Sequence, residues 1–458
     1  MTAPLMEMSP ESLLALAAQV VGRALPGEQL EVACSHGLST SIRVYEGEVE
    51  SLTQAEAQGI GIRVIVGGRQ GFASAGTLDL AVVDQMLAEA RDNARFAETD
   101  PDAGVAEPDG VKAVEVDLWR DELFDWTIEQ KIAMAVEVER RVRSADRRIT
   151  GVRTSTYSDN AGATALASSS GIRAASRATS SGVGVQALAA DGGQIQTGYA
   201  GDGARHPGLL DLDGVVERAG RQALDLLGAT KPTSRRVSLV LDQRQASTML
   251  SVIAGTLNGS RVIKGRTPFA DRVRETIASP LLTMLDDPID PESLGADSHD
   301  GEGLACRRVP LIADGVLQGF VWDSYTGRRG GTGSTGSAQR GARGLPSPGI
   351  HALSVCSGSS GSLEDLIAGV EDGVLVFGFA GLHSGVNAVS GDLSLGVEGL
   401  VVRNGQLAEP INEATVGSTL PRLLLDIVAV GSDRLHLPSG VSTPSLVIGD
   451  VMLSGASA

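Results

Sequence analysis

The chain has 458 residues and carries 56 acidic against 38 basic side chains, which gives a formal net charge of −18. Because nucleic acids and anionic membranes are bound by clustered Lys and Arg, this balance argues against either as a partner. Hydrophobic residues make up 42% of the chain but aromatic residues only 3%. The core must therefore consist mainly of Ala, Val, Leu and Ile, and the length predicts two or three domains.

The cysteines and the apolar segments indicate the compartment. Cys34, Cys306 and Cys356 lie far apart and form no CxxC pair, so neither a disulfide framework nor a structural zinc knot is expected. No apolar run approaches the ~20 residues that span a bilayer, and the N-terminal region lacks the basic and apolar segments of a signal peptide. We therefore expect a cytoplasmic protein that is not embedded in a membrane.

The first predicted unit spans residues 1–105 and combines helices with strands. Ser9, Pro10 and Glu11 are typical of a helix start, and a second amphipathic helix is predicted over residues 80–96. Between the two helices, alternating or β-branched residues predict strands over 31–34, 40–45, 48–56, 59–66 and 69–75. We expect an α+β domain with its helices on one face of a sheet.

The second predicted unit spans residues 106–232. An acidic, proline-containing linker over residues 99–125 leads into it. A helix over 127–144 follows, then short strands with Gly and Ser turns as far as residue 203, and then a helix over 213–227. This unit is predicted to be a second α+β segment.

Residues 233–458 form the third predicted unit, a large β-rich domain. Short apolar strand patterns dominate it, and Asp314-Gly315 and Asn404-Gly405 are typical two-residue hairpin turns. Residues 328–361 are rich in Gly, Ser and Arg and poor in apolar residues, so we expect a mobile surface loop there. The predicted fold class is therefore α+β, with a helix-flanked N-terminal sheet region followed by a β-rich C-terminal domain.

Two short motifs resemble cofactor-binding or catalytic loops but lie in the wrong context. Residues 331–336 match G-x-G-x-x-G, yet no apolar helix face follows them, so a dinucleotide-binding loop is not expected. Residues 357–361 do not form the Gly-x-Ser-x-Gly turn of a serine hydrolase. Cys306 and Cys356 lack the local signature of a nucleophile and are interpreted as small packed residues.

An acidic stretch over residues 286–302 contains seven carboxylates and one histidine. A site built from His299, Asp300 and Glu302 could hold a metal ion or act as an acid and base. The spacing does not match a calcium-binding loop, and a solvated or hydrogen-bonded loop is the simpler interpretation. Both interpretations stay open at this point.

The six histidines are the most informative residues for metal chemistry. No two of them lie within five residues of each other, so no H-E-x-x-H or H-E-x-x-x-H zinc motif can be written. This spacing is strong evidence against an autonomous metalloprotease whose zinc ligands lie on one helix.

Ordered blocks of sequence carry a family resemblance. Residues 390–396 read Ser-Gly-Asp-Leu-Ser-Leu-Gly, residues 401–406 read Val-Val-Arg-Asn-Gly-Gln, and residues 426–433 read Asp-Ile-Val-Ala-Val-Gly-Ser-Asp. Upstream, residues 299–303 read His-Asp-Gly-Glu-Gly and are followed by Asp-Gly-Val-Leu at 314–317. This series resembles the TldD/PmbA family of metalloproteases and extends over nearly the whole chain.

The chain differs from the zinc-binding members of that family at one helix. In those members a helix at the start of the C-terminal domain carries H-E-x-x-x-H, and the shared Leu and Gly place Leu250, Ser251 and Gly255 at its His, Glu and second His. None of the three can bind zinc or act as a base. The family's additional Cys ligand has no counterpart in residues 437–441. We therefore predict no catalytic and no metal-binding residues, as in the zinc-free TldE/PmbA-like branch.

The resemblance implies that the chain is one subunit of a heterodimer. A TldD-like partner would supply zinc and catalysis, while this chain would bind no cofactor and would close a chamber for unfolded or modified peptides. His299, Asp300, Glu302 and Asp392 are the candidates for lining the substrate channel. Two alternatives stay open: a stand-alone metallopeptidase with a non-standard metal site, and a peptide-binding regulator of another assembly, such as the gyrase-modulating role suggested for the family.

Overall fold

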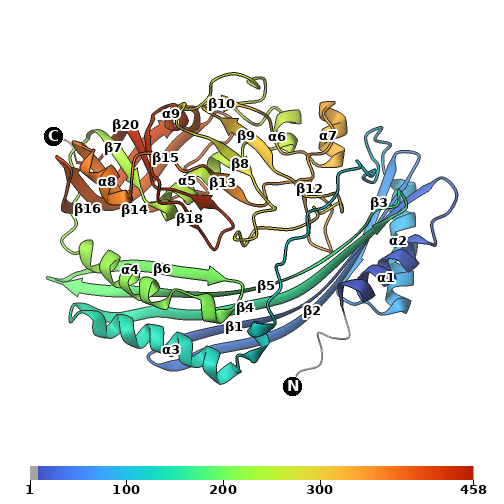
Figure 1. Cartoon of the computed structure of the whole chain (residues 1–458), viewed down its shortest axis with the longest axis horizontal. Helices are drawn as coiled ribbons and strands as arrows, with labels where there is room; N and C mark the ends of the chain where they lie inside the picture. Colours follow the sequence, from blue (N-terminus) through green and yellow to red (C-terminus); the bar gives the residue numbers. More distant parts are fainter. Residues whose placement is uncertain (1–8, 457–458) are drawn as a thin grey trace.

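The computed structural model describes residues 9–456, which form a curved sheet and a C-terminal body that face each other. Figure 1 shows the sheet, coloured blue to green, curving beneath the C-terminal body, coloured yellow to red. Helices and strands occur in both parts, so the predicted α+β class is confirmed.

The N-terminal sheet has six antiparallel strands in the order β3-β2-β1-β4-β5-β6. The strands are β1 (Glu28–Tyr45), β2 (Glu48–Val66), β3 (Arg69–Ala75), β4 (Ile149–Ser168), β5 (Arg173–Asp191) and β6 (Gln194–Ala204). β1 pairs with β2 on one side and with β4 on the other, so segments from both sides of the linker share one sheet. The predicted boundary at residue 105 thus separates two parts of one sheet, and the division into domains stays a prediction.

Two pairs of predicted strands are in fact continuous. The predicted strands 31–34 and 40–45 are parts of β1, which has 18 residues, and the next two predicted strands are parts of the 19-residue β2. The gap in the first pair contains Gly37, which stays in register opposite Gly162 of β4. Glycine weakens a strand locally, but pairing on both sides keeps this backbone extended.

Helices cover one face of this sheet at its two ends (Figure 1). They are α1 (Pro10–Val21) and α2 (Leu80–Phe96) at one end, and α3 (Ile128–Ala145) and α4 (Leu212–Asp225) at the other. The helices predicted over 80–96, 127–144 and 213–227 are confirmed, with ends shifted by at most two residues.

Local sequence explains where these helices begin and how closely they pack. The side chains of Ser9 and Thr127 accept hydrogen bonds from backbone N–H groups in the first turns of α1 and α3. A Cβ atom at Gly71 would lie 1.9 Å from a backbone oxygen of α2, and one at Gly198 would lie 2.2 Å from a backbone oxygen of α4. Only glycine therefore lets these two helices lie so close to the sheet.

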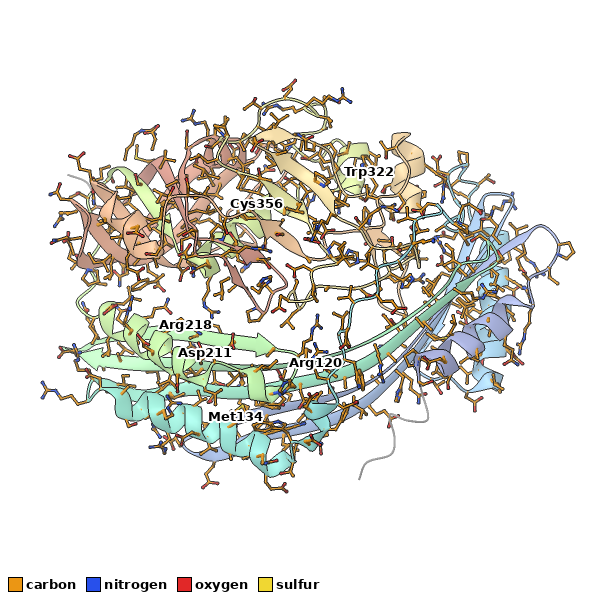
Figure 2. The ribbon with its side chains drawn as sticks, in the orientation of Figure 1. Arg120, Met134, Asp211, Arg218, Trp322 and Cys356 are labelled. Carbon is orange, nitrogen blue, oxygen red and sulfur yellow. The ribbon has the colours of Figure 1, made fainter. Side chains whose placement is uncertain are left out.

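The acidic linker runs across the inner face of the sheet, opposite the helices. Thr179 of β5 donates its backbone N–H to the Leu118 carbonyl (3.0 Å), and the Arg120 N–H donates to the Thr179 hydroxyl (3.1 Å). The Val116 N–H donates to the hydroxyl of Ser298 in the C-terminal body (3.1 Å). The linker, which ends in the short helix η2 (Asp121–Asp125), thus contacts both layers, and Figure 2 labels Arg120 between them.

The C-terminal body contains two larger sheets. The first has the order β16-β15-β14-β7-β20-β17, and its edge strand β16 also pairs with β20. Its strands are β7 (Arg235–Leu241), β14 (Asp372–Ala380), β15 (Asp392–Arg403), β16 (Gln406–Thr419), β17 (Ile427–Val430) and β20 (Leu446–Ser454). The second sheet comprises β10 (Val316–Leu317), β9 (Val309–Ala313), β8 (Met284–Asp286), β13 (Leu353–Val355), β19 (Ser442–Thr443) and β18 (Leu435–His436). The predicted β-rich C-terminal region is confirmed.

Short helices and tight turns complete this body. The helices are α5 (Gln243–Ala254), α6 (Gly259–Ile263), α7 (Ser324–Gly330), α8 (Leu363–Ala368) and α9 (Leu420–Leu425). Both predicted hairpin turns are confirmed, since Asp314-Gly315 and Asn404-Gly405 have positive φ angles at both residues and connect paired strands.

The prediction of a surface loop over residues 328–361 is wrong for part of that segment. Residues 336–338 and 352–355 are buried, and the segment contains β11 (Ala338–Gln339), β12 (Ser347–Pro348) and β13. The small residues serve close packing: a Cβ atom at Gly336 would lie 2.5 Å from a backbone oxygen at Ala305. A composition that resembles a flexible loop here reflects backbone segments in contact.

The G-x-G-x-x-G motif lies at the end of a helix. Gly331 has a left-handed conformation (φ 67°) and caps the C-terminus of α7. A phosphate-binding loop must instead open a helix, so that N-terminal N–H groups face the phosphate. The structure therefore agrees with the prediction that this motif is not a dinucleotide-binding loop.

The states of the cysteines and the properties of the helices can be compared with the predictions on cysteine packing and on membrane segments. All three cysteines are free; Cys34 and Cys306 are buried, as packed residues should be, whereas Cys356 is exposed. None of the helices formed by residues 9–456 is both long and apolar enough to cross a membrane.

Candidate functional site

Three pockets lie in a row, of which the two outer ones are between the inner face of the N-terminal sheet and the C-terminal body and the middle one is lined by residues of that body alone. The arginine pocket, lined by Arg244, has a volume of about 380 Å³; the helix pocket, lined by Ser251, has about 240 Å³; and the histidine pocket, lined by His299, has about 680 Å³. Ser439 lines both the arginine and helix pockets, and His351 lines both the helix and histidine pockets. The three pockets therefore adjoin one another.

Helix α5 places the positions of the zinc motif beside the helix pocket. The helix begins directly after β7, where the Asp242 carboxylate accepts a hydrogen bond from the backbone N–H of Gln245 (2.8 Å). Leu250 points into the C-terminal core and is 1% exposed, whereas Ser251 and Gly255 line the pocket. These positions offer a metal ion one hydroxyl group. They do not fit zinc, which takes imidazole, thiolate or carboxylate ligands.

The rest of the helix pocket offers hydrogen bonds and apolar contact. The segment 437–441 contributes Ser439, whose Oγ lies 3.3 Å from the Oγ of Ser247. Apolar residues complete the wall: Ala254, Val321, Ile350, Leu353 and Val441. Within residues 9–456, no three His, Cys, Asp or Glu side chains are grouped so as to hold a metal ion.

The histidine pocket contains two of the four predicted channel residues. His299 and Asp300 line it, together with His351, which sequence analysis missed. Burial lowers the pKa of His299, and its Nδ1 atom has no hydrogen-bond partner among the described residues. A neutral imidazole with a free nitrogen can donate or accept a hydrogen bond from a ligand in this pocket.

His351 forms a buried pair with Asp286. Burial lowers the pKa of His351 to about 4 and raises the pKa of Asp286 to about 7. The Asp286 Oδ1 atom accepts hydrogen bonds from the backbone N–H groups of His351 (3.0 Å) and Ala352 (2.8 Å). The His351 Nδ1 atom is 3.9 Å from the Asp286 Oδ2 atom, too far for a hydrogen bond. The contact between the two side chains therefore does not offset the cost of burying their charges. As a result, His351 is uncharged at neutral pH.

Asp300 and Glu302 hold backbone segments in place. The Asp300 carboxylate accepts hydrogen bonds from the N–H groups of Glu302 (2.9 Å), Leu304 (3.0 Å) and Ala338 (3.0 Å), and Glu302 accepts one from the N–H of Ser324 (2.8 Å). Burial raises the pKa of Asp300 to about 6 and that of Glu302 to about 7. Both Asp300 oxygens and one Glu302 oxygen already bind backbone N–H groups, while the Oε1 atom of Glu302 has no hydrogen-bond partner among the described residues. Since the described residues also contain no group of three such ligands, the geometry gives no support to a metal site built from His299, Asp300 and Glu302.

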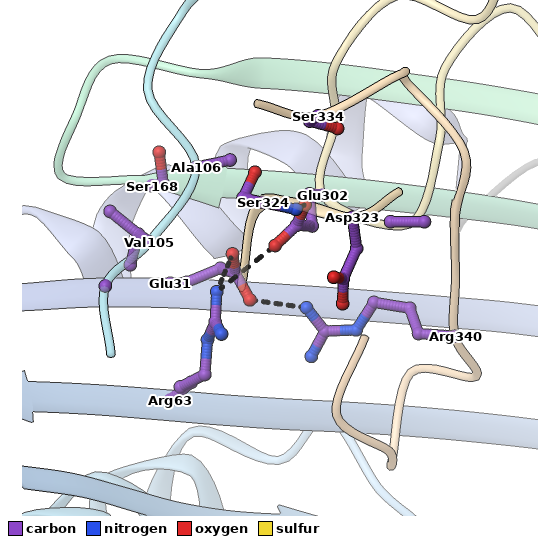
Figure 3. Close-up of polar contacts among 12 residues, drawn as sticks. Glu31, Arg63, Val105, Ala106, Ser168, Glu302, Asp323, Ser324, Ser334 and Arg340 are labelled. Atoms are coloured by element: carbon purple, nitrogen blue, oxygen red, sulfur yellow. Dashed lines mark hydrogen bonds and ion pairs between the residues drawn. The ribbon is translucent and has the colours of Figure 1, made fainter. Parts of the chain in front are cut away.

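Glu302 belongs to a buried network of ion pairs beside the histidine pocket. Figure 3 shows the Glu31 carboxylate between the guanidinium groups of Arg63 and Arg340. Burial would raise the pKa of Glu31, but the two arginines together hold it below its ordinary value. A Glu302 oxygen lies 3.9 Å from Arg63.

The network could be found only in part from the sequence. Glu31 and Arg63 are direct partners in the register of β1 and β2, which a hairpin alignment could reveal. Arg340 comes from the Gly- and Ser-rich segment 328–361 and carries no local signal. The network joins this segment to the N-terminal sheet and fixes one wall of the histidine pocket.

Asp392 lies apart from the other predicted channel residues. It is exposed at the start of β15 and accepts a hydrogen bond from the Ser390 hydroxyl (2.7 Å). It lines none of the three pockets. The structure thus groups His299, Asp300 and Glu302 and does not bring Asp392 to them.

Three family models together match most of the chain. The model described as PmbA/TldA metallopeptidase domain 1 matches residues 30–94, the central-domain model matches residues 121–227, and the C-terminal-domain model matches residues 234–455.

Individual proteins are similar over nearly the whole chain. Metalloprotease PmbA from Escherichia coli O157:H7 is 26% identical over 448 residues, which covers 97% of this chain and 96% of that protein. A solved structure from Bacteroides thetaiotaomicron, described as a proposed modulator of DNA gyrase, is 28% identical with a TM-score of 0.86, covering 97% of this chain and 99% of that one. TldE from Thermococcus kodakarensis has the same TM-score and coverage at 22% identity, which shows the shared fold.

Proposed function

Because this chain belongs to the PmbA/TldD metallopeptidase family, we propose that it is the non-catalytic, TldE/PmbA-like subunit of a heterodimeric zinc metalloprotease. The observation that carries the proposal is helix α5, where Leu250 is buried in the core and Ser251 and Gly255 face the helix pocket. Zinc and the catalytic base belong to a TldD-like partner chain. The cytoplasm is the compartment in which the two chains meet.

The role of this chain is to hold an extended peptide while the partner cleaves it. The backbone edge of β5 supports this role. β4 pairs with β5 along one edge, but along the other edge β6 pairs only with residues 181–191, so that second edge of residues 173–178 has no strand partner among the described residues. Ala174, Ala175 and Ser176 from this free edge line the histidine pocket. A peptide that pairs with such an edge is bound through its backbone, independently of its sequence.

This mode of binding suits unfolded or modified peptides as substrates. Backbone pairing requires an extended chain, which a folded protein does not present. Holding the peptide in place raises the rate of cleavage because it orients the peptide bond. This chain supplies no reacting group of its own.

Peptide hydrolysis with separate and mixed chains tests the proposal. The purified chain, a TldD-like chain from the same organism and their mixture are each incubated with a library of unfolded peptides. The proposal requires cleavage by the mixture, co-elution of the two chains, and no cleavage by this chain alone. Cleavage by this chain at the rate of the mixture would contradict it.

A second candidate function, regulation of DNA gyrase, follows from the description of the Bacteroides thetaiotaomicron relative. Capture of partners from a lysate of the source organism separates the two. A TldD-like chain as the main partner supports the protease subunit, whereas gyrase subunits as the main partners support the regulator.

A further inference from the structure

The arginine pocket contains a cation, Arg244, that has no partner among residues 9–456. Its floor is the inner face of β4, β5 and β6, and α5 and the segment 437–439 form the opposite wall. The floor residues are mostly small or hydroxylated: Thr156, Ser158, Gly182, Val183, Gly184, Tyr199 and Gly201. Arg244 is the only Lys or Arg that lines the pocket, and its guanidinium makes no hydrogen bond or ion pair with any other residue of the described chain.

The acidic groups around Arg244 do not fully balance its positive charge. Burial and the nearby Arg218 lower its pKa, and together they outweigh Asp242, Asp202 and Tyr199, which act in the opposite direction. These acids already have other partners: Asp242 caps α5, and Asp202 accepts a hydrogen bond from a backbone N–H at the start of α4 (2.9 Å).

Arg218 is engaged on the neighbouring helix. Its Nη1 atom lies 3.5 Å from the Oδ2 atom of Asp211, and Figure 2 shows Arg218 on α4 and Asp211 at the start of that helix. A further anion is therefore favoured at Arg244.

We propose that the arginine pocket binds a carboxylate group of the peptide substrate, with the Arg244 guanidinium as its main hydrogen-bond donor. This inference rests on the proposed function, and it adds a charged anchor to the sequence-independent pairing at β5. Guanidinium and carboxylate groups form two parallel hydrogen bonds, which makes such pairs strong and directional. A single negative charge suits the pocket better than a phosphate group, because Asp202 in the floor of the pocket repels a second charge.

Two parts of a peptide could supply the carboxylate, namely its free C-terminus or an acidic side chain. Three fluorescent peptides of one length separate them: one with a free C-terminus and no acidic residues, one with the same sequence and an amidated C-terminus, and one amidated with a single internal Glu. Their affinities for the purified full chain are measured by fluorescence anisotropy at low salt.

The wild-type chain should bind at least one carboxylate-bearing peptide at least about tenfold more tightly than the amidated, acid-free peptide. Arg244→Gln should abolish this preference, and Arg244→Lys should retain part of it, since a lysine keeps the charge but not the two parallel donors. Arg221→Gln is the matched control, because Arg221 is exposed on α4, outside the pocket, and its loss changes the net charge equally. Equal affinity for all three peptides, or an unchanged preference in Arg244→Gln, would overturn the inference.

A small probe separates this inference from the proposed function. N-acetylalanine and N-acetylalaninamide are compared for their effect on the thermal unfolding of the wild-type chain and of Arg244→Gln. Stabilisation by the acid alone, lost in the variant, supports the carboxylate site even if no long peptide binds, and in that case only the peptide-holding role fails. Peptide binding without any dependence on a carboxylate defeats only the carboxylate site.

Discussion

The two ends of the row of pockets differ in how their charged residues are used. At the histidine pocket, Glu31, Arg63 and Arg340 are buried and bound to one another, and Asp300 binds three backbone N–H groups. At the arginine pocket, Arg244 is partly buried and has no partner in the described chain. Charges at the first end stabilise the fold, whereas the charge at the second end is available to a ligand.

The largest predicted effect is the loss of an arginine from the buried network. Arg340→Ala leaves the fully buried Glu31 with one partner fewer, so the free energy of unfolding should fall by about 3–5 kcal/mol. Chemical denaturation followed by circular dichroism measures this.

Arg343→Ala is the matched control for that variant. Arg343 is exposed three residues further along the same segment and forms no ion pair with the described residues, so its loss should change stability by less than about 0.5 kcal/mol. If both variants lost the same stability, the charges at the histidine pocket would not differ from exposed charges in their contribution to the fold, and the contrast with the arginine pocket would fail.

Asp286→Asn tests the buried pair at the junction of the histidine and helix pockets. The pKa of Asp286 is about 7 in the folded chain against an ordinary value of 3.8, so the folded state binds a proton that the unfolded state has released. Its contribution to stability is therefore fully present below pH 4 and is lost as the pH rises through about 7. An asparagine keeps the acceptor for the two backbone N–H groups without the charge.

The expected signature is a difference between two pH values. At pH 8 the variant should be more stable than the wild type by up to about 4 kcal/mol, and at pH 4 the two should be similar. Thermal unfolding of both proteins across this range measures it. A variant that is less stable than the wild type at pH 8 would show that the carboxylate is charged and stabilising.

The smallest expected effect on stability is at Arg244. Since its guanidinium forms no pair in the described chain, Arg244→Gln should change the free energy of unfolding by less than about 0.5 kcal/mol, as should the exposed control Arg221→Gln. Urea denaturation of both variants measures this. A loss of 2 kcal/mol or more in Arg244→Gln, on the order of a broken buried pair, would assign this arginine to the fold.

Much of the fold could be predicted from local sequence. The helices were found because they combine amphipathic faces with capping residues such as Ser9 and Thr127. The strands were found but cut too short, because glycines such as Gly37 resemble turns when the pairing partners are unknown. The packed part of the segment 328–361 was missed because glycine signals close contact and flexibility equally well.

The candidate site could be predicted only where its residues are neighbours in sequence. His299, Asp300 and Glu302 lie close together along the chain, and the structure keeps them together. Arg244 and Ser439 meet in one pocket although they are far apart in sequence. Only the tertiary packing of the C-terminal body brings these two residues together.

The zinc content of the purified chain tests the central claim most directly. The three zinc-motif positions at helix α5 offer a single hydroxyl group, that of Ser251, so we predict well under one zinc per molecule in the chain alone and about one zinc per heterodimer after assembly with a TldD-like partner. One tightly bound zinc in the isolated chain, retained on dialysis against a chelator, would contradict the account.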